Sequence, residues 1–355
     1  MLRSHLHGIV LEASEKHLRV LFVAPFPPPR HGISVYSERL FGELSKIEGL
    51  EVIRLDVRSE DKKYLSASRI PRLISRIFRA HSTWNFHLIH TQCLLVPGIA
   101  SLIASKLLGK PLILTFHGSG IVPKTYFGLG RSRLILSKPL AKLLSLLSEY
   151  SVAVSPWIKE ELPRSVFLPP GFPKTSRSTH RERKICFVGR LTEEKNPLPL
   201  LEAVSRIEDE NLKLVFIGNG PLRKKLELRA KNLSMDSKVL FLGEVSEKEA
   251  LDHIRSSMLL VIPSEYEVFP LVLTEALSSG TPVLVSEGKW SEWIRFKGVI
   301  RSPTSPEELS NKIKEVLSRI DELTAEISME DFPSWEEISR AYYSIYKLLA
   351  GGEID

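Results

Sequence analysis

The sequence has no long apolar run and little cysteine. No window approaches the roughly 18 uncharged apolar residues that a membrane-spanning helix needs. Glu12 and Glu15 interrupt the one short apolar patch near the N-terminus, which therefore lacks the apolar core of a secretory signal. The two cysteines, Cys93 and Cys186, fall in different predicted domains, so we expect two small core residues and no disulfide. These absences predict a cytoplasmic protein without a transmembrane helix.

Acidic residues are missing from a long stretch of the first half. Residues 62–148 contain 13 Lys and Arg and no Asp or Glu. Residues 1–170 hold 23 basic against 12 acidic side chains, whereas residues 171–355 hold 26 against 30, so the net charge of +7 originates in the first half. This one-sided distribution predicts an anionic partner for that part of the chain.

Two motif classes are also absent. No G-x-G-x-x-G run follows an early strand, which argues against a nicotinamide-dependent oxidoreductase. Aromatic residues are few in the basic half and no recognition motif occurs there, which argues against a nucleic-acid-binding protein.

What the sequence does have is a regular alternation of short apolar strands and amphipathic helices. This pattern predicts an α/β protein with parallel sheets covered on both faces. The alternation pauses at a stretch rich in Pro, Ser and charge and then restarts, which predicts two doubly wound domains. The predicted organisation is a polar leader expected to be flexible (1–17), a Rossmann-like domain (18–170), a linker (171–183), a second Rossmann-like domain (184–330) and a final helix (331–355).

The final helix has an aromatic face. Trp335, Ile338, Tyr342 and Ile345 recur at helical spacing. We expect this helix to cross back and pack on the first domain.

Binding residues are expected in loops that follow strands, because open parallel sheets bind ligands beyond the carboxyl ends of their strands. After Gly189, Arg190 and Lys195 are five residues apart, and two cations at a strand end can share the oxygens of one diphosphate. A solvated lysine paired with Glu193 or Glu194 is an equally good interpretation.

Other strand ends carry glycine or histidine. Gly218 and Gly220 could let a ligand approach the backbone, although so short a motif is also typical of a plain turn. Gly32 opens a helix where an anion could bind, although a proline-stiffened turn explains the pattern nearly as well. His117 ends an apolar strand before two glycines, which favours a functional position, and His90 is placed similarly in a weaker context.

The stretch EYEVFPLVLTE places Glu267 and Glu275 eight residues apart around the start of a helix. Proline is favoured in the first helical turn, so Pro270 predicts a positive helix end suited to a phosphate. We expect three backbone amides at that end, those of Val268, Phe269 and Leu271. The two carboxylates would then contact different parts of one ligand. By spacing alone, a surface carboxylate beside a buried helix is the favoured interpretation.

These motifs together resemble a known family. FVGRL with Lys195, FIGNGP, FLGEV and the E-x7-E pattern followed by ALSSGTPVL are similar to the retaining, nucleotide-sugar-dependent glycosyltransferases of family 4 (GT4). The resemblance is nearly continuous from about residue 185 to 288 and thinner before it, where it rests on the Gly32 loop, His117 and Ser155. Where the family usually has Gly-Gly, this chain has His31-Gly32. The resemblance implies the GT-B fold, in which two Rossmann-like domains face a cleft.

The resemblance also implies roles for matching residues. The catalytic set would comprise His117, near the reacting carbon, Glu267, on sugar hydroxyls, and the diphosphate-binding Arg190 and Lys195. Donor binding would further involve the ribose-binding Glu275, the base-binding segment that contains Val245, and the strand-end and helix-start residues Gly32, Gly189, Gly218, Gly220, Val268, Phe269, Pro270 and Leu271. Arg and Lys would supply the charge that a metal supplies elsewhere, so no metal and no cofactor besides the donor substrate is expected.

The basic first half would bind the acceptor. A helix with four arginines at helical spacing can lie on an anionic membrane surface, although arginines that snorkel from an ordinary surface helix fit the periodicity as well. They are Arg69, Arg72, Arg76 and Arg79, and residues 131–148 are a second, less regular candidate. The expected protein transfers a sugar with retention to a glycan or lipid-linked acceptor, in the cytoplasm or on the cytoplasmic membrane face. The alternatives are a nucleotide-sugar-binding protein without transferase activity, or another GT-B enzyme such as an epimerase.

Overall fold

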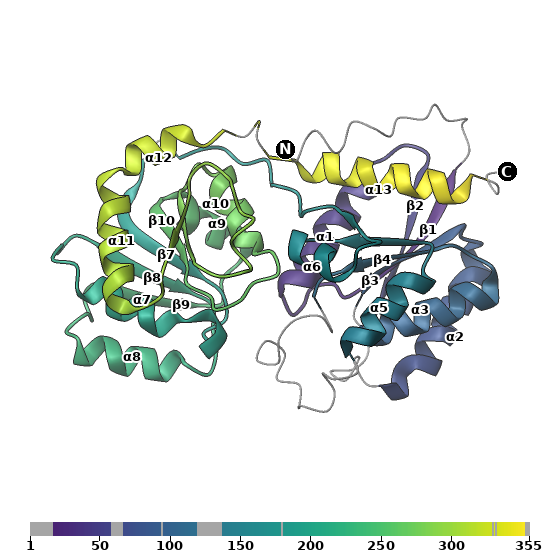
Figure 1. Ribbon diagram of the computed structural model, residues 1–355, viewed down its shortest axis with the longest axis horizontal. Helices are drawn as coiled ribbons and strands as arrows, with labels where there is room; N and C mark the ends of the chain where they lie inside the picture. Colours follow the sequence, from purple (N-terminus) through teal and green to yellow (C-terminus); the bar gives the residue numbers. More distant parts are fainter. Residues whose placement is uncertain are drawn as a thin grey trace. The chain divides into compact units, whose positions relative to one another are not determined.

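The computed structural model describes residues 17–57, 67–93, 95–118, 137–178, 180–328, 330 and 332–351. It divides into two compact units (Figure 1): unit 1 is Met1–Gly171 with Pro333–Asp355, and unit 2 is Phe172–Phe332. Each unit contains a six-stranded parallel sheet flanked by helices, so the predicted α/β class with two doubly wound sheets is confirmed. All but the last residue of the predicted leader, 1–17, lies outside the described residues.

The sheet of unit 1 has the strand order β2-β1-β3-β4-β5-β6. The central strands β1 and β4 are apolar and buried on both faces, as expected when helices cover both sides of a parallel sheet, whereas the edge strands β2 and β6 are partly exposed. Their bounds are β1 Leu18–Ala24, β2 Leu50–Asp56, β3 Leu88–Cys93, β4 Leu112–Phe116, β5 Tyr150–Ala153 and β6 Val166–Phe167.

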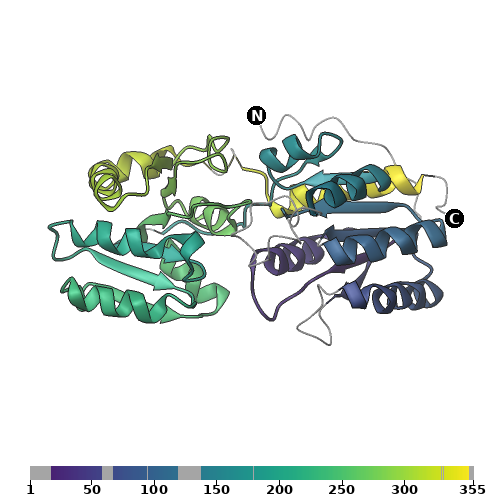
Figure 2. The same ribbon diagram turned by 60° about the horizontal axis from the view of Figure 1, so that its bottom comes forward.

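Helices cover the two faces of this sheet separately. Successive residues of a strand point to opposite faces, and in β3 the side chain of His90 reaches the last helix whereas Thr91 bonds Ser101 of α3. Helices α2, α3 and α5 lie in a row on the α3 side (Figures 1 and 2). The helices of unit 1 are α1 Gly32–Leu44, α2 Ile70–Trp84, α3 Leu95–Leu108, α5 Ser137–Leu147, α6 Pro156–Glu161 and α13 Trp335–Ala350.

The last helix, α13, packs on α1 in unit 1, as its aromatic face predicts. Ser334 caps its start: the hydroxyl accepts from the amide of Glu337 at 3.2 Å, and the Glu337 carboxylate accepts from the amide of Ser334 at 2.7 Å. The apolar residues at helical spacing, with the additional Tyr346, are buried. The C-terminal segment thus completes the core of the first unit.

The sheet of unit 2 has the order β12-β11-β10-β7-β8-β9. Its strands are β7 Glu182–Val188, β8 Lys213–Ile217, β9 Val239–Gly243, β10 Ser257–Ile262, β11 Val283–Ser286 and β12 Val299–Ser302. Its helices are α7 Pro197–Ser205, α8 Arg223–Asn232, α9 Glu247–Arg255, α10 Leu271–Ser278, α11 Pro306–Ser318 and α12 Ile320–Glu326.

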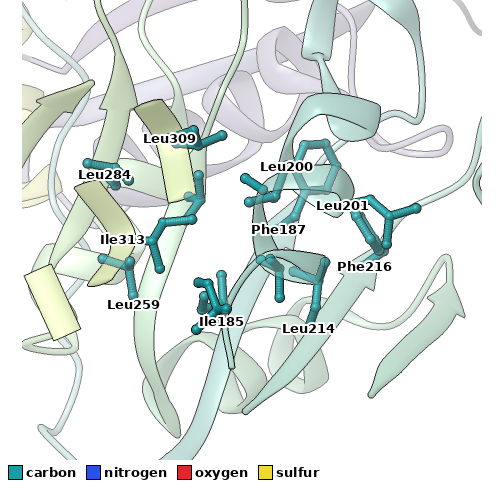
Figure 3. Packing of buried hydrophobic residues seen from close by; sticks show 14 of the residues in the cluster. Ile185, Phe187, Leu200, Leu201, Leu214, Phe216, Leu259, Leu284, Leu309 and Ile313 are labelled. Carbon is teal, nitrogen blue, oxygen red and sulfur yellow. The ribbon is translucent and has the colours of Figure 1, made fainter. Parts of the chain in front are cut away.

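The core of unit 2 has two layers, one on each side of the sheet. In β7, Ile185 and Phe187 join the layer beneath α7, α8 and α11 (Figure 3), whereas Cys186 between them joins the layer beneath α9 and α10. Burial raises the pKa of the Cys186 thiol to about 12, so it is the small core residue that the sequence predicts. Cys93 belongs to unit 1, and its side chain lies outside the described part of the chain.

The segment predicted as a linker begins inside a core. Phe172 is buried in unit 2, where its ring stacks on that of Phe332 with centroids 4.4 Å apart. The two ends of unit 2 are therefore packed against each other, because each carries an aromatic residue. No helix in the described ranges has the length and apolar character needed to cross a membrane.

Candidate functional site

Two loops of unit 2 meet where the strand order of its sheet reverses. The chain runs from β7 to β8 and β9 on one side and then places β10 on the other side of β7. Doubly wound sheets bind ligands at such a switch point, beyond the carboxyl ends of the two neighbouring strands. The loop after β7 carries Lys195, the loop after β10 carries Glu267, and their side chains form an ion pair. The structure thus brings together two predicted site residues that are distant in sequence.

The Lys195–Glu267 pair is nearly enclosed. The two side chains are 14% and 8% exposed. Ser264 Oγ donates to Glu267 Oε1 at 2.7 Å, the oxygen that also accepts from Lys195 Nζ. Because desolvating two charges offsets most of their attraction, such a pair adds little net stability. Its place at the switch point therefore favours a role in binding.

Backbone contacts hold both loops. The amide of Glu265 donates to the carbonyl of Glu194 at 2.9 Å and so joins the loop after β10 to the loop after β7. Lys195 ends a short 3-10 turn, Glu193–Lys195. The carbonyl of Ser264 accepts a hydrogen bond from the buried hydroxyl of Ser286 in β11. These bonds fix the loop backbones from which Lys195 and Glu267 extend.

Arg190 lies at the rim of the same loop. Its side chain is 60% exposed and pairs with Glu194 at 3.0 Å. Lys195 is mostly buried and contacts Glu267, so it is not the solvated lysine of the alternative interpretation. In this structure the two predicted diphosphate-binding cations thus have different carboxylate partners.

The glycines after β8 have a structural explanation. A Cβ on Gly218 would lie 2.0 Å from the carbonyl oxygen of Gly189, and one on Gly220 would lie 2.4 Å from that of Leu191. The amide of Leu191 also donates to the carbonyl of Asn219 at 3.0 Å. Packing of one loop backbone on the other therefore requires glycine at both positions. This supports the interpretation of Gly218–Gly220 as a turn, independent of any ligand.

The helix after Glu267 begins later than predicted. Pro270 is its N-cap, with an extended conformation (φ −72°, ψ 114°), and α10 starts at Leu271. Val268 and Phe269, whose amides we expect at the helix end together with that of Leu271, precede the N-cap and so lie outside the helix. The Phe269 side chain is buried, with its ring centroid 5.2 Å from that of Trp293. The amides at the positive helix end begin with that of Leu271.

Two predicted donor-binding residues, Glu275 and Val245, are half-buried in unit 2. Glu275 is half-buried in the second turn of α10. Val245 follows β9, is half-buried, and packs against the apolar layer beneath α9 and α10. The side chain of Val245 thus belongs to the edge of the core.

In unit 1, His117 follows β4 and is 7% exposed. Its Nε2 lies 2.6 Å from Gln92 Oε1, which accepts the ring proton, and Tyr36 packs edge-on with ring centroids 4.5 Å apart. Burial, and next the charge of His31, lowers the pKa of His117 to about 3. The imidazole is therefore neutral near pH 7 and held in one orientation.

The loop after β1 ends in a histidine cap. His31 is the N-cap of α1: its Nδ1 accepts from the amide of Ser34 at 3.3 Å, and Ser34 Oγ accepts from the amide of His31 at 3.0 Å. Gly32 is the first helical residue, as predicted. The imidazole takes one of the amides that an anion would otherwise use, so His31 restricts the predicted anion site.

Hydrogen bonds connect His117 to the interior of unit 1. Gln92 Nε2 lies 3.1 Å from His90 Nε2, and His90 Nδ1 lies 2.5 Å from the hydroxyl of Tyr346 in α13. His90 is fully buried, and burial, followed by the charge of His117, lowers its pKa to about 3. Gln92 thus bridges two neutral histidines.

A second branch of this network also ends on α13. Thr115 Oγ1 lies 2.9 Å from His90 Nε2 and 2.9 Å from the hydroxyl of Tyr342, which lies 3.1 Å from that of Tyr36. Burial raises the pKa of Tyr342 to about 12, so its hydroxyl stays protonated. The C-terminal helix therefore takes part in orienting His117.

Acidification is expected to destabilise unit 1 well above the range in which carboxylates titrate. Histidine has a pKa of about 6.5 in an unfolded chain, whereas His90 and His117 have pKa values of about 3 in the fold. Between these values the unfolded chain binds protons that the folded chain does not. The two histidines therefore do not lower the free energy of unfolding above about pH 6.5. Between about pH 6.5 and about pH 3 each histidine lowers it by up to about 1.4 kcal/mol for every pH unit.

Urea unfolding at about pH 7.5 and about pH 5.5 measures this effect. His90→Gln is a useful second sample: even if it is less stable, its urea midpoint should depend less on pH than that of the parent chain. Equal midpoints of the parent at both pH values would contradict the expectation.

The predicted arginine helix is α2 with the turn before it. Arg72 and Arg79 are exposed, and Arg69 is half-buried. Arg76 is half-buried and donates to the backbone carbonyl of Asp56, at the end of β2, at 2.8 Å; burial lowers its pKa. Two of the four arginines thus face solvent, and Arg76 ties the helix to the sheet.

Sequence reasoning did not identify Gln92 or Ser264. Gln92 lies at the end of β3, and Ser264 lies two residues after β10. The strand-end criterion that selects His117 would have selected both.

In the part of the chain that the structure describes, no group of three or more His, Cys, Asp or Glu side chains is arranged to hold a metal ion.

Two protein-family models match the chain almost end to end. The model described as Glycosyltransferase Family 4 matches residues 3–171, and that described as Glycosyl transferases group 1 matches residues 172–328. The border between these matches coincides with the border between units 1 and 2.

Two relatives from one organism are named as glycosyltransferases. An uncharacterized glycosyltransferase of Methanocaldococcus jannaschii is 26% identical over 362 residues, which cover 94% of this chain and 99% of that protein. Another of the same organism is 35% identical over 176 residues; the match covers 47% of this chain and 45% of that protein, less than half of its length.

Solved structures share the architecture of the whole chain. Sucrose-phosphate synthase from Thermosynechococcus elongatus has a TM-score of 0.79, with 18% identity over 95% of this chain and 100% of that one. Anabaena HepE in complex with UDP and glucose has a TM-score of 0.70, with 16% identity over 93% of this chain and 99% of that one. At these identities the likeness concerns the fold alone.

Proposed function

The chain belongs to glycosyltransferase family 4 and has the GT-B fold, and from this premise we propose that it transfers a sugar from a nucleotide-sugar donor to a glycan or lipid-linked acceptor with retention of configuration. In this reaction the bond between the anomeric carbon and the diphosphate oxygen breaks. A bond from the same carbon to an acceptor hydroxyl oxygen forms, the hydroxyl proton is lost, and a nucleoside diphosphate leaves.

One observation carries the proposal: the enclosed Lys195–Glu267 pair at the switch point of unit 2. A nucleotide sugar presents a diphosphate next to sugar hydroxyls. An ammonium group matches the phosphate oxygens, and a carboxylate accepts hydrogen bonds from hydroxyls. We expect Lys195 to bind the diphosphate of the donor and Glu267 to bind its sugar. The hydrogen bond from Ser264 would keep the Glu267 carboxylate in place.

Further groups of unit 2 would complete the donor site. The Arg190 side chain is 60% exposed in its pair with Glu194, and exposed pairs contribute about 0 to 1 kcal/mol, so we expect its guanidinium to turn to a diphosphate at little cost. The positive end of α10 at Leu271 adds a favourable field for the phosphates. Glu275, in the second turn of this helix, would bind the ribose. These cations and amides supply the positive charge, so we propose that no metal is needed.

In unit 1, His117 would contact the donor sugar as a neutral imidazole. The structural likeness to HepE, which was solved with UDP and glucose, supports a nucleotide sugar as the ligand. Retention of configuration and the ribose role of Glu275 rest on the E-x7-E motif of the family.

A panel of UDP-, GDP- and ADP-linked hexoses tests the proposal. Release of the nucleoside diphosphate is measured with glycan acceptors and with membrane extract, with and without a chelator. We expect one donor to be turned over, at the same rate when the chelator is present. The anomeric coupling in the proton NMR spectrum of the product then reads the configuration.

The alternatives have different outcomes in the same assay. A binding protein would retain a donor without releasing nucleoside diphosphate, and an epimerase would change the sugar of its substrate without needing an acceptor. Either outcome, or the absence of turnover with every donor, would overturn the proposal.

A further inference from the structure

Unit 1 exposes five large apolar side chains on two neighbouring helices. Half of the exposed large apolar side chains in the described part of the chain lie on α3 and α5. We call this set the α3–α5 ridge: Ile103, Leu107, Leu143, Leu146 and Leu147. Leu107 is 67% exposed and Leu146 is 52% exposed, so these side chains are not at the margin of the core.

The ridge follows from the helical period. Ile103 and Leu107 are one turn apart on α3, and Leu143 and Leu147 are one turn apart on α5, so each pair shares a face of its helix. The opposite faces are buried, with Ala104 on α3 as an example. The two helices contact each other and lie side by side in both views (Figures 1 and 2). Their outward faces therefore form one surface.

Basic side chains border this surface. Lys106 on α3 and Lys138 and Lys142 on α5 are exposed, and the whole stretch of residues 62–148 contains no acid. Lys106 pairs with Glu149 at 2.5 Å, and Lys138 pairs with Glu161 at 2.7 Å. Exposed pairs of this kind are weak, so the lysines can exchange these carboxylates for phosphates.

Helix α2, the arginine helix, is packed against the rest of unit 1. Its apolar residues Leu73 and Ile77 are buried in unit 1, and Arg76 is bound to the end of β2. The arginine helix therefore offers positive charge but uses most of its apolar face for packing and exposes one large apolar side chain, Trp84, at its last residue. On the neighbouring helices α3 and α5, apolar side chains face outward instead.

We propose that the α3–α5 ridge is a docking surface for an anionic lipid bilayer. Outward leucines beside lysines are the composition of a surface that inserts its apolar side chains at the lipid boundary and binds the headgroup phosphates with its cations. The lack of acids on these helices favours an anionic partner over a protein surface of mixed charge. This inference specifies the acceptor side of the proposed function, and it is tested without any donor.

Sedimentation of the full chain with vesicles tests the proposal. The vesicles contain equal parts of phosphatidylcholine and phosphatidylglycerol, at low salt, and pure phosphatidylcholine vesicles serve for comparison. We expect the chain to sediment with the anionic vesicles. Leu107→Ser and Leu143→Ser should each lower the partition coefficient about tenfold, and Lys142→Ala should lower it about fivefold. These residues are exposed, so circular dichroism should show an unchanged fold.

Leu348→Ser is the matched control. Leu348 is 56% exposed on α13, which contacts the opposite face of the sheet, and its replacement should leave vesicle binding unchanged. Failure to bind the anionic vesicles, equal binding to pure phosphatidylcholine, or equal losses for Leu107→Ser and Leu348→Ser would overturn the proposal. So would ridge variants that dissociate a dimer in sedimentation velocity but bind vesicles as before. A negative result would leave the donor chemistry untouched, because turnover of a nucleotide sugar is measured separately.

Discussion

Replacing Lys195 with alanine is expected to lower nucleoside diphosphate release about 10²- to 10³-fold, which is the usual effect of removing one preorganised group that stabilises developing charge. The ammonium group is held at the switch point by Glu267 and would face the diphosphate as it leaves. Negative charge on this leaving group is largest in the transition state. The loss should therefore appear mainly in kcat, with a smaller rise in KM for the donor.

Substitutions of Glu267 and of a lysine outside the site separate donor binding from the effect of losing a charged pair. Glu267→Gln keeps hydrogen bonding to Ser264 but removes the charge, and it should lower turnover less than Glu267→Ala. Lys312→Ala removes a lysine on α11 that pairs with Glu315, and it should have no effect on turnover. If Lys195→Ala kept parental kcat and KM, the assignment of the Lys195–Glu267 pair to the donor would be wrong.

Replacing Tyr342 with alanine is expected to cost unit 1 about 3 to 5 kcal/mol of stability, as for other large buried aromatic residues. Tyr342 is fully buried on α13, its ring stacks on that of His90 with centroids 4.9 Å apart, and its hydroxyl bonds Thr115 and Tyr36. Tyr342→Phe keeps the ring and loses the hydroxyl, so it should cost about 1 to 3 kcal/mol.

Hydrogen exchange of the full chain, read by mass spectrometry, locates this effect. Peptides from β1 should lose protection in Tyr342→Ala, whereas peptides from β10, in unit 2, should keep it. Tyr343→Ala is the control, because the neighbouring Tyr343 is only half-buried and its ring contacts Lys347 at the surface. Equal losses in both variants, or a loss of protection in β10, would contradict the role of α13 in unit 1.

Much of the fold follows from local patterns. In β7, three successive residues are apolar because helices cover both faces of the sheet: Ile185, Cys186 and Phe187. This apolar run can be recognised in the sequence without the structure. The aromatic spacing of the last helix likewise predicts its buried face. The edge strands β6 and β12 are harder to predict, because they have two and four residues and only one neighbouring strand each.

The residues of the candidate site could be predicted only in part from the sequence. Strand-end position selected His117, Lys195 and Glu267, but it did not tell which carboxylate Lys195 contacts or that Gln92 holds His117. The sequence offered both the arginine helix α2 and residues 131–148 as membrane contacts, but it did not tell that Leu73 and Ile77 of α2 are buried whereas five large apolar side chains of α3 and α5 face outward. The difference arises because amphipathic periodicity shows which face of a helix is apolar and not whether another helix covers it.

The sequence by itself determined the α/β class, the division into two sheets, the helix that returns to the first unit, and the strand ends at which to search. Each of these depends on the order and spacing of residues that are close in the chain. Only the tertiary structure decided that Lys195 meets Glu267, that tyrosines of α13 reach His90, and that the α3–α5 ridge is exposed. These are contacts between segments distant in sequence, and they depend on strand order and helix packing, which local spacing does not encode.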